Sequence, residues 1–316
     1  MNKNTAGKLP VKYIIIACCT YKRPEKLERL LKNLCTINYP ENIKTEILVI
    51  DNDKAKSAEG IVEKFQDVLA VHYIMEEEKG LSNVRNRAIK EAFKLGAGHI
   101  AFIDDDEIAD INWLVNHVDF YKKFENIYIS SGPAYKKFEN KYPDYIINNI
   151  IFSASSSKKL GEYKKTCASN NVFFPLNIIE ESRIYFSVDF NLSGSEDTDF
   201  FGRLKEAGYA LGWDFYFVVF LFVNDERADI KWILKRAFYN GYSVSVVKFL
   251  HKKQFFNRLM YISSKFLTIC LDLLIVVFSL PFGLTKFFNS LTRLTKNSGK
   301  FAGAVILRNH KYYGEQ

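Results

Sequence analysis

One segment constrains the fold of this chain more than any other. Residues 98–103 are mostly small or apolar, and residues 104–107 are four consecutive acids. The first part predicts a strand covered on both faces, as strands of a parallel sheet are. Ligands of open α/β sheets bind beyond the carboxyl ends of the strands, where these acids begin. Adjacent carboxylates repel one another, so the position favours a divalent cation with oxygen ligands. The alternative is an acidic turn before a helix N-terminus, where negative charge is stabilised.

Strands and helices are predicted to alternate from Lys12 to Ser131. Strands are expected at 12–19, 45–51, 70–75, 98–104 and 126–131, and helices near 24–34, 57–67, 83–95 and 111–121. This order predicts a doubly wound, mostly parallel α/β sheet with helices on both faces. Ser82 is expected to cap the third helix, and Gly96 is expected to end it.

The pattern becomes less regular after Gly132. The segment 133–168 has few periodic runs and is expected to form a loop near a binding site. Further strands are expected at 169–174 and within 209–223. A helix should begin at Glu196 and end at Gly208. The segment 227–250 predicts a long helix that is interrupted at Asn240–Gly241.

The net charge of +8 belongs to the C-terminal part of the chain. Residues 248–316 hold eleven lysines and arginines against two acids, and they are also very apolar. That combination favours an anionic membrane surface over nucleic acid. We therefore expect a catalytic domain at 1–247 and a helical, membrane-associated segment at 248–316, which contacts the membrane surface through 248–300.

The apolar run at 266–282 includes Asp272 and is short for a membrane span. A membrane-spanning helix needs roughly 20 residues, and basic residues flank this run on both sides. We therefore expect a helix in the membrane plane or a re-entrant helix. The alternative is a helix buried in the protein core.

The cysteines and the N-terminus point to a reducing compartment. There are five cysteines, an odd number, and none has CxxC spacing. This argues against a disulfide framework or a zinc site. The apolar run after the first lysines is only about seven residues long, which favours a first strand over a signal peptide. We expect a peripheral or monotopic protein at the cytoplasmic face of the cell membrane.

Three groups of acids are expected at the same edge of the sheet: Asp51 with Asp53, Asp104–Glu107, and Glu196 with Asp197. Acids after an early strand can accept hydrogen bonds from a base or a ribose. The second group can hold a metal against a diphosphate, and the third can supply a general base. The chain has no glycine-rich phosphate loop, so metal and Arg or Lys must bind the diphosphate.

Five motifs carry a resemblance to a known family. They are Thr20-Tyr21-x-Arg23-Pro24, Asp51-Asn52-Asp53, Gly80-Leu81-Ser82-Asn83-Val84-Arg85-Asn86, Asp104–Glu107 and Gly194-Ser195-Glu196-Asp197-Thr198-Asp199-Phe200. Together, over about residues 11–245, they resemble glycosyltransferase family 2, the inverting enzymes with the GT-A fold. Gly299-x-x-x-Gly303 with Tyr312-Tyr313 is similar to tails of membrane-associated members.

The resemblance implies a role for each matching residue. The nucleotide and the sugar diphosphate would be bound by Thr20, Tyr21, Arg23, Asp51, Asp53, Arg85, Asn86, Asp104 and Asp105. Asp106, with Asp104, would hold Mn²⁺ or Mg²⁺ in a DxD-type motif. Asp197 would be the catalytic base, supported by Glu196. Arg227 and Arg236 resemble basic contacts on a later helix. Leu221 stands where many relatives carry a histidine or an acid, which leaves one metal or diphosphate contact open unless Asp225 or Glu226 supplies it.

The resemblance implies transfer of a sugar from a nucleotide-diphosphate sugar, most often a UDP-sugar. The acceptor would be a hydroxyl of a cell-surface polysaccharide or a lipid-linked glycan. Two alternatives are a metal-dependent nucleotidyl- or phosphotransferase on a similar sheet, and a non-catalytic membrane-binding protein. His72, His99 and His117 lack metal-ligand spacing, so we expect them to be structural.

Overall fold

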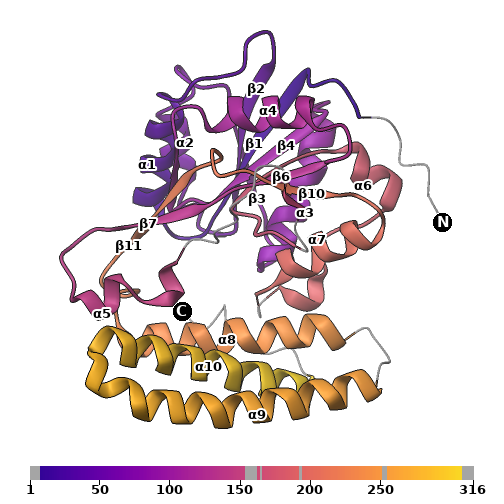
Figure 1. The fold of residues 1–316 in the computed structure, drawn as a ribbon. Helices are drawn as coiled ribbons and strands as arrows, with labels where there is room; N and C mark the ends of the chain where they lie inside the picture. Colours follow the sequence, from indigo (N-terminus) through magenta and orange to yellow (C-terminus); the bar gives the residue numbers. More distant parts are fainter. Residues whose placement is uncertain (1–7, 154–161, 164–165, 192–193, 251–254, 308–316) are drawn as a thin grey trace. The chain divides into compact units, whose positions relative to one another are not determined.

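The computed structural model describes residues 8–153, 162–163, 166–191, 194–250 and 255–307 (Figure 1). The chain forms two compact units. The sheet unit contains Met1–Tyr135, Ser155–Asn191 and Glu196–Leu221. The helical unit contains Lys136–Ala154, Leu192–Ser195 and Phe222–Gln316. The boundary expected after residue 247 falls within the helical unit.

The main sheet has eight strands in the order β3-β2-β1-β4-β9-β6-β10-β8. They are β1 (Tyr13–Thr20), β2 (Lys44–Asp51), β3 (Val71–Met75), β4 (His99–Ile103), β6 (Ile129–Ser131), β8 (Glu162–Tyr163), β9 (Asn171–Pro175) and β10 (Leu211–Trp213). Strands β3, β2, β1 and β4 are parallel, which confirms the predicted class. The simple alternation is wrong, because β9 is inserted antiparallel between β4 and β6 and a further short strand follows β4 in the chain.

Helices cover both faces of this sheet (Figure 1). The two sets are α1 (Pro24–Leu34), α2 (Glu59–Glu63) and α4 (Trp113–Lys123) on one face, and α3 (Leu81–Lys94), α6 (Asn177–Ser182) and α7 (Glu196–Glu206) on the other. Side chains of a strand alternate between the faces, so Ile14 and Ile16 enter one core and Ile15 and Ala17 the other. All four are fully buried, which stabilises the sheet by about 1.5–3 kcal/mol for each isoleucine.

The expectation of a loop at 133–168 is wrong where the structure describes it. The segment contains β7 (Ala134–Phe138), α5 (Asp144–Ile147), a 3₁₀ turn (Ile150–Phe152) and β8. Such short elements show no clear period in the sequence. Residues 154–161 and 164–165 lie outside the described residues. A second sheet has the order β5-β11-β7, with β5 at Glu107–Ala109 and β11 at Val219–Val223.

The helical unit contains α8 (Ile230–Phe249), α9 (Phe255–Ser279) and α10 (Leu284–Ile306), and α10 packs against both others (Figure 1). The interruption expected at Asn240–Gly241 is wrong, because α8 continues through it. Gly241 instead allows close approach: a Cβ there would lie 1.9 Å from the carbonyl oxygen of Lys296. A Cβ on Gly299 of α10 would lie 2.0 Å from the carbonyl oxygen of Phe238.

Helix α9 is longer than the apolar run predicts. It has 25 residues, and Phe255–Phe282 is long and apolar enough to cross a membrane by length and composition. Only 11% of its apolar 18-residue stretch is buried inside the protein. The alternative that residues 266–282 form a helix of the protein core is therefore wrong. The C-terminal part of the chain therefore presents an apolar helix that is a candidate for membrane association.

Candidate active site

The acids that follow β4 lie beside cations from α1 and its N-terminal loop. Asp105 accepts hydrogen bonds from Thr20 Oγ1 at 2.8 Å and from an Arg23 guanidinium nitrogen at 3.3 Å. Arg23 also lies 3.7 Å from Asp106 Oδ2, and Lys26 Nζ lies 4.0 Å from the same oxygen. The loop after β1 therefore supplies positive charge to the acidic edge of the sheet.

The carboxylates after β4 are crowded and partly removed from water. Desolvation raises the pKa of Asp105 to about 6 against the opposing charge of Arg23. The pKa of Asp104 is also raised by desolvation, with Arg85 opposing and Asp106 adding to the shift. Negative charge is costly at this edge of the sheet, so a bound cation would be stabilised there.

Arg85 of α3 joins two of the acidic groups. Its guanidinium donates to Glu196 Oε1 at the start of α7 and lies 3.8 Å from Asp104 Oδ1. Arg85 is 7% exposed and Glu196 is 4% exposed. Burial opposes the charge of Arg85, but Glu196 and Asp104 hold its pKa above the usual value. Burial raises the pKa of Glu196, and Arg85 opposes that shift.

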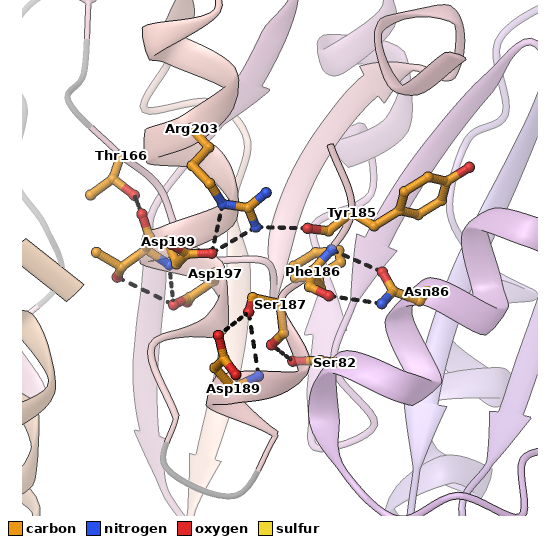
Figure 2. A network of polar contacts seen from close by, with 11 residues as sticks. Ser82, Asn86, Thr166, Tyr185, Phe186, Ser187, Asp189, Asp197, Asp199 and Arg203 are labelled. Carbon is orange, nitrogen blue, oxygen red and sulfur yellow. Dashed lines mark hydrogen bonds and ion pairs between the residues drawn. The ribbon is translucent and has the colours of Figure 1, made fainter. Parts of the chain in front are cut away.

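Asp197 belongs to the same charge cluster. Its Oδ1 accepts from the backbone N–H of Thr198 at 2.6 Å and from Thr198 Oγ1 at 3.3 Å (Figure 2). Its negative charge acts on Arg85, Asp104 and Glu196. The structure therefore brings together the acids of β4 and α7, as the sequence predicts. Asp197 is partly exposed, unlike Glu196.

The chain between α6 and α7 is clamped from both sides (Figure 2). Asn86 of α3 donates to the carbonyl of Phe186 at 2.8 Å and accepts from its N–H at 2.9 Å. Ser82 Oγ donates to the carbonyl of Ser187 at 2.7 Å. From α7, Arg203 donates to the carbonyl of Tyr185 at 2.7 Å. The amide of Asn86 is therefore engaged in fixing the segment between the helices that carry Arg85 and Glu196.

The prediction that Ser82 caps α3 is wrong. The N-cap residue is Gly80, and Asn191 supplies the cap from the clamped segment. Asn191 Oδ1 accepts from the N–H groups of Ser82 and Asn83 at 2.9 and 3.1 Å. A Cβ on Gly80 would lie 2.3 Å from Asn191, so only glycine fits beside this cap.

Asp51 ends β2 next to Thr20 in the strand register. It is fully buried and accepts hydrogen bonds from the N–H groups of Asp53 and Ala58 at 2.9 and 3.0 Å and from Tyr73 Oη at 3.1 Å. Asp51 therefore organises the loop that follows β2. Asp53 Oδ1 in turn accepts from the N–H of Ala55 at 3.2 Å.

Tyr21 follows β1 and is partly exposed. Lys22 Nζ and Lys79 Nζ lie 5.4 and 5.6 Å from the centre of its ring. In the later chain, Leu221 lies in β11 opposite Glu107 of β5. Asp225 belongs to the helical unit and accepts from Asn140 and from Tyr142 Oη at 3.0 and 2.5 Å. The helical unit also holds Arg227 and Arg236.

Sequence reasoning assigned no role to two asparagines that shape this edge of the sheet. Asn52 donates to the carbonyls of Glu76 and Glu78 at 2.8 and 2.9 Å and accepts from the N–H of Gly80 at 2.9 Å. Asn171 of β9 accepts from Trp113 Nε1 at 2.8 Å and is 1% exposed. The position of Asn52 between two acids at a strand end could have indicated a role in the site. The sequence around Asn171 gives no such indication.

Two of the acids after β4 have the chemistry to serve as ligands of a hard divalent cation. Within the described ranges, no group of three or more His, Cys, Asp or Glu side chains is arranged to hold a metal ion. Asp104, whose side chain is 41% exposed, and Asp106 offer two carboxylates instead. Mg²⁺ typically takes one or two carboxylates and completes its coordination with substrate phosphates and water. Two acids after β4 match that pattern.

Comparisons with known proteins identify the family of the chain. The sequence profile of "Glycosyl transferase family 2" matches residues 14–181. The chain is 28% identical over 236 residues to the succinoglycan biosynthesis protein ExoM of Rhizobium meliloti (strain 1021), covering 72% of this chain and 73% of that one.

Solved structures share the fold. S. aureus TarS 1–349 has a TM-score of 0.53 at 13% identity, with 90% of each chain covered. The mannosyltransferase PcManGT of Pyrobaculum calidifontis, in complex with GDP-Man and Mn²⁺, has a TM-score of 0.55 at 18% identity, with 75% of this chain and 65% of that one covered. The family profile covers more than half of the chain, and the fold is of the GT-A type, so the chain belongs to glycosyltransferase family 2.

Proposed function

We propose that this glycosyltransferase inverts the configuration of the sugar that it transfers. The proposed donor is a nucleotide-diphosphate sugar, specifically a UDP-sugar. The observation that carries the proposal is the cluster in which Arg85 joins Asp104 of the β4 edge to Glu196, with Asp197 beside them. One general base next to a cation-lined acidic edge suits a single in-line displacement.

In the proposed reaction, Asp197 accepts the proton of an acceptor hydroxyl. The acceptor oxygen forms a bond to the anomeric carbon while the bond from that carbon to the nucleoside diphosphate breaks on the opposite face. The Thr198 N–H and hydroxyl hold one carboxylate oxygen of Asp197, which leaves the other for the proton. Glu196 orients Arg85 and through it the carboxylate of Asp104.

The donor is proposed to lie along the ends of β1, β2 and β4. Thr20, Tyr21 and Asp53 would contact the nucleotide, and Arg23 with Asp105 would lie at the diphosphate. Mn²⁺ or Mg²⁺ held by Asp104 and Asp106 would neutralise charge on the departing nucleoside diphosphate. Asp51 and Asn86 are proposed to act by fixing the backbone, because their side chains already make hydrogen bonds to it.

Relatives support the choice of donor and acceptor. TarS has been solved with UDP-GlcNAc and with UDP, whereas PcManGT was solved with GDP-Man and Mn²⁺. ExoM is named for the biosynthesis of a polysaccharide, succinoglycan. We propose that the acceptor is a hydroxyl of a cell-surface polysaccharide or of a lipid-linked glycan at the cytoplasmic face of the membrane.

Replacing Asp197 by Asn tests the proposed base. We expect the transfer rate with a UDP-sugar and Mn²⁺ to fall by roughly 10²–10⁴-fold, the usual contribution of a general base. Asp67→Asn, at an exposed acid of the same unit, should transfer normally. Near-normal transfer by the Asp197 variant would rule out this base. A product with retained anomeric configuration, or release of pyrophosphate in place of a nucleoside diphosphate, would overturn the proposed reaction.

A further inference from the structure

Helix α9 has the reverse of the polarity expected in water. Its three charged residues, Arg258, Lys265 and Asp272, are spaced by seven and lie on one stripe, and all three are partly or fully covered. The other faces carry large apolar side chains that are mostly exposed. These include Phe256 at 78%, Leu259 at 50%, Met260 at 73%, Leu267 at 61%, Leu271 at 53%, Leu274 at 57%, Val277 at 69% and Phe278 at 68%. Water-soluble proteins rarely expose such a continuous apolar surface.

Helix α10 supplies partners for two of the three charges of that stripe. Arg258 donates to the carbonyls of Ala304 and Val305 at 2.7 and 2.8 Å. Further along α9, Asp272 accepts from Arg293 Nε at 2.8 Å and from Asn297 Nδ2 at 2.7 Å. Asp272 is 1% exposed. With these two charges matched, α9 leaves mainly apolar surface, together with Lys265, for an outside partner.

The side of α10 that meets the polar stripe of α9 carries several cations. Lys286, Arg293 and Lys300 of α10 are spaced by seven, so they lie on the side of α10 whose Arg293 reaches Asp272. Burial lowers the pKa of Lys300, and repulsion from Lys265 and Lys296 adds to the shift. Residues 255–307 contain six lysines and arginines and one acid. An anionic partner would relieve this repulsion, which favours a lipid leaflet with negative headgroups over a second copy of the same basic surface.

The packing of α10 decides how α9 meets the lipid. If α9 crossed a bilayer with its polar stripe still covered, α10 would have to cross beside it. The cations of α10 from Lys286 to Lys300 would then be spread over about 21 Å of membrane depth, because a helix rises about 1.5 Å for each residue. Charged groups are disfavoured throughout that region. When α9 lies in the plane of the membrane, its apolar faces reach the acyl chains and the same cations stay at the level of the phosphates.

We propose that α9, backed by α10, lies in the plane of one leaflet of an anionic membrane. Its exposed apolar residues would be buried among the acyl chains, and Lys265, Lys286, Lys296 and Lys300 would contact lipid phosphates. This inference goes beyond the transfer reaction. Vesicle binding is measured without donor or acceptor, so its failure would leave the transferase proposal intact.

Co-sedimentation of the full chain with vesicles tests the surface. We expect binding to vesicles of phosphatidylcholine and phosphatidylglycerol in a two-to-one ratio, and at least tenfold weaker binding for Phe256→Ser/Val277→Ser/Phe278→Ser. Lys286→Gln/Lys296→Gln/Lys300→Gln should bind these anionic vesicles at least tenfold more weakly but pure phosphatidylcholine vesicles unchanged.

Matched controls come from exposed positions of the sheet unit. Val68→Ser/Val188→Ser and Lys54→Gln/Lys90→Gln/Lys122→Gln should bind like the unaltered chain. Equal vesicle binding by all variants would overturn the proposal. So would an unaltered chain that fails to bind vesicles and instead dimerises through α9.

Depth measurements separate the in-plane helix from a spanning one. The environment-sensitive dye NBD would be attached at Phe256→Cys, Leu267→Cys or Phe278→Cys, each in a chain in which the exposed Cys35 and Cys270 are replaced by Ser. Quenching by lipids labelled at defined depths should give the same shallow depth at all three sites. A label at residue 267 near the bilayer centre, with both others near the surfaces, would show a spanning helix and overturn the proposal.

Discussion

At the scale of single residues, Arg85 and Glu196 form a buried ion pair between α3 and α7. Arg85→Met leaves the buried Glu196 carboxylate without its cation, so we expect a loss of about 3–5 kcal/mol in the free energy of unfolding. Urea denaturation would measure it. The control is Arg87→Met on the same helix, whose side chain is 34% exposed beside Glu91 and should cost less than about 1 kcal/mol. Similar losses in both variants would contradict a special role for the pair.

His99 gives the sheet unit a predictable response to acid. It is fully buried at 5.0 Å from the Tyr121 ring and 5.4 Å from the Phe173 ring, and neither ring nitrogen has a hydrogen-bond partner among the described residues. Burial, aided by the charge of Lys8, lowers its pKa from 6.5 to about 4. Between these values the unfolded chain binds a proton that the folded chain does not. The contribution of neutral His99 to the free energy of unfolding is therefore fully present above pH 6.5. It is lost progressively as the pH falls toward 4.

His99→Phe removes that titration. Between pH 7.5 and 4.5 the unaltered chain should lose roughly 2–3 kcal/mol more than the variant, since one pKa unit corresponds to about 1.36 kcal/mol. Urea denaturation at both pH values gives the difference, and carboxylates and His117 cancel because they are present in both chains. Equal losses in the two chains would show that His99 is not held neutral by burial.

The sequence revealed charged residues of the candidate site better than amides. Asp104 and Asp197 were predictable because acids at strand ends and helix starts stand out from their surroundings, whereas Arg85 was named only by the family resemblance. Asn191 and Asn171 were not, because each acts through partners that are distant in the chain and leave no local pattern. Asn86 was recognised, but its engagement with the Phe186 backbone depends on a chain segment that no periodicity predicts.

At the scale of elements, the contact between α8 and α10 depends on glycine. Gly299→Ala would place a Cβ 2.0 Å from the carbonyl oxygen of Phe238, so we expect a loss of about 1–3 kcal/mol as the helices separate. Gly202→Ala is the matched control, because a Cβ there has nothing within 4 Å inside α7 and should stabilise by about 0.5–1 kcal/mol. Thermal melts of the full chain in one detergent would compare them. A neutral or stabilising Gly299→Ala would show that the helices are not in close contact.

Elements were predictable where they are long and periodic. Helix α1 and the strands β1, β2 and β4 follow from hydrophobic spacing, and α3 was expected from the residues at its two ends. The insertion of β9 between β4 and β6 does not, because a short apolar strand carries no record of its direction or its neighbours. An interruption of α8 was wrongly expected at Gly241 because glycine disfavours isolated helices. The local sequence cannot predict that Gly241 packs against α10, because α10 is distant in the chain.

At the scale of the whole molecule, the two proposed ligands, the sugar nucleotide and the anionic membrane, are expected to bind different units. Every residue proposed to bind the donor, the metal or the acceptor hydroxyl belongs to the sheet unit, whereas the apolar and basic helices α9 and α10 belong to the helical unit. A ligand stabilises the structure that binds it, by an amount that grows with its concentration relative to its Kd. The two ligands should therefore protect different amides from hydrogen exchange.

We expect UDP-sugar with Mn²⁺ to slow exchange at the ends of β1 and β4 and in the first turn of α3, and to leave α9 and α10 unchanged. Anionic vesicles should do the reverse. At 100 times Kd the donor contributes about 2.7 kcal/mol, which slows exchange through global unfolding of the unit by about 100-fold. Asp106→Asn is the control, because it should abolish the Mn²⁺-dependent part of the donor effect and leave the vesicle effect intact. Donor protection of α9, or vesicle protection of the β4 edge, would show instead that the two units respond to their ligands as one body.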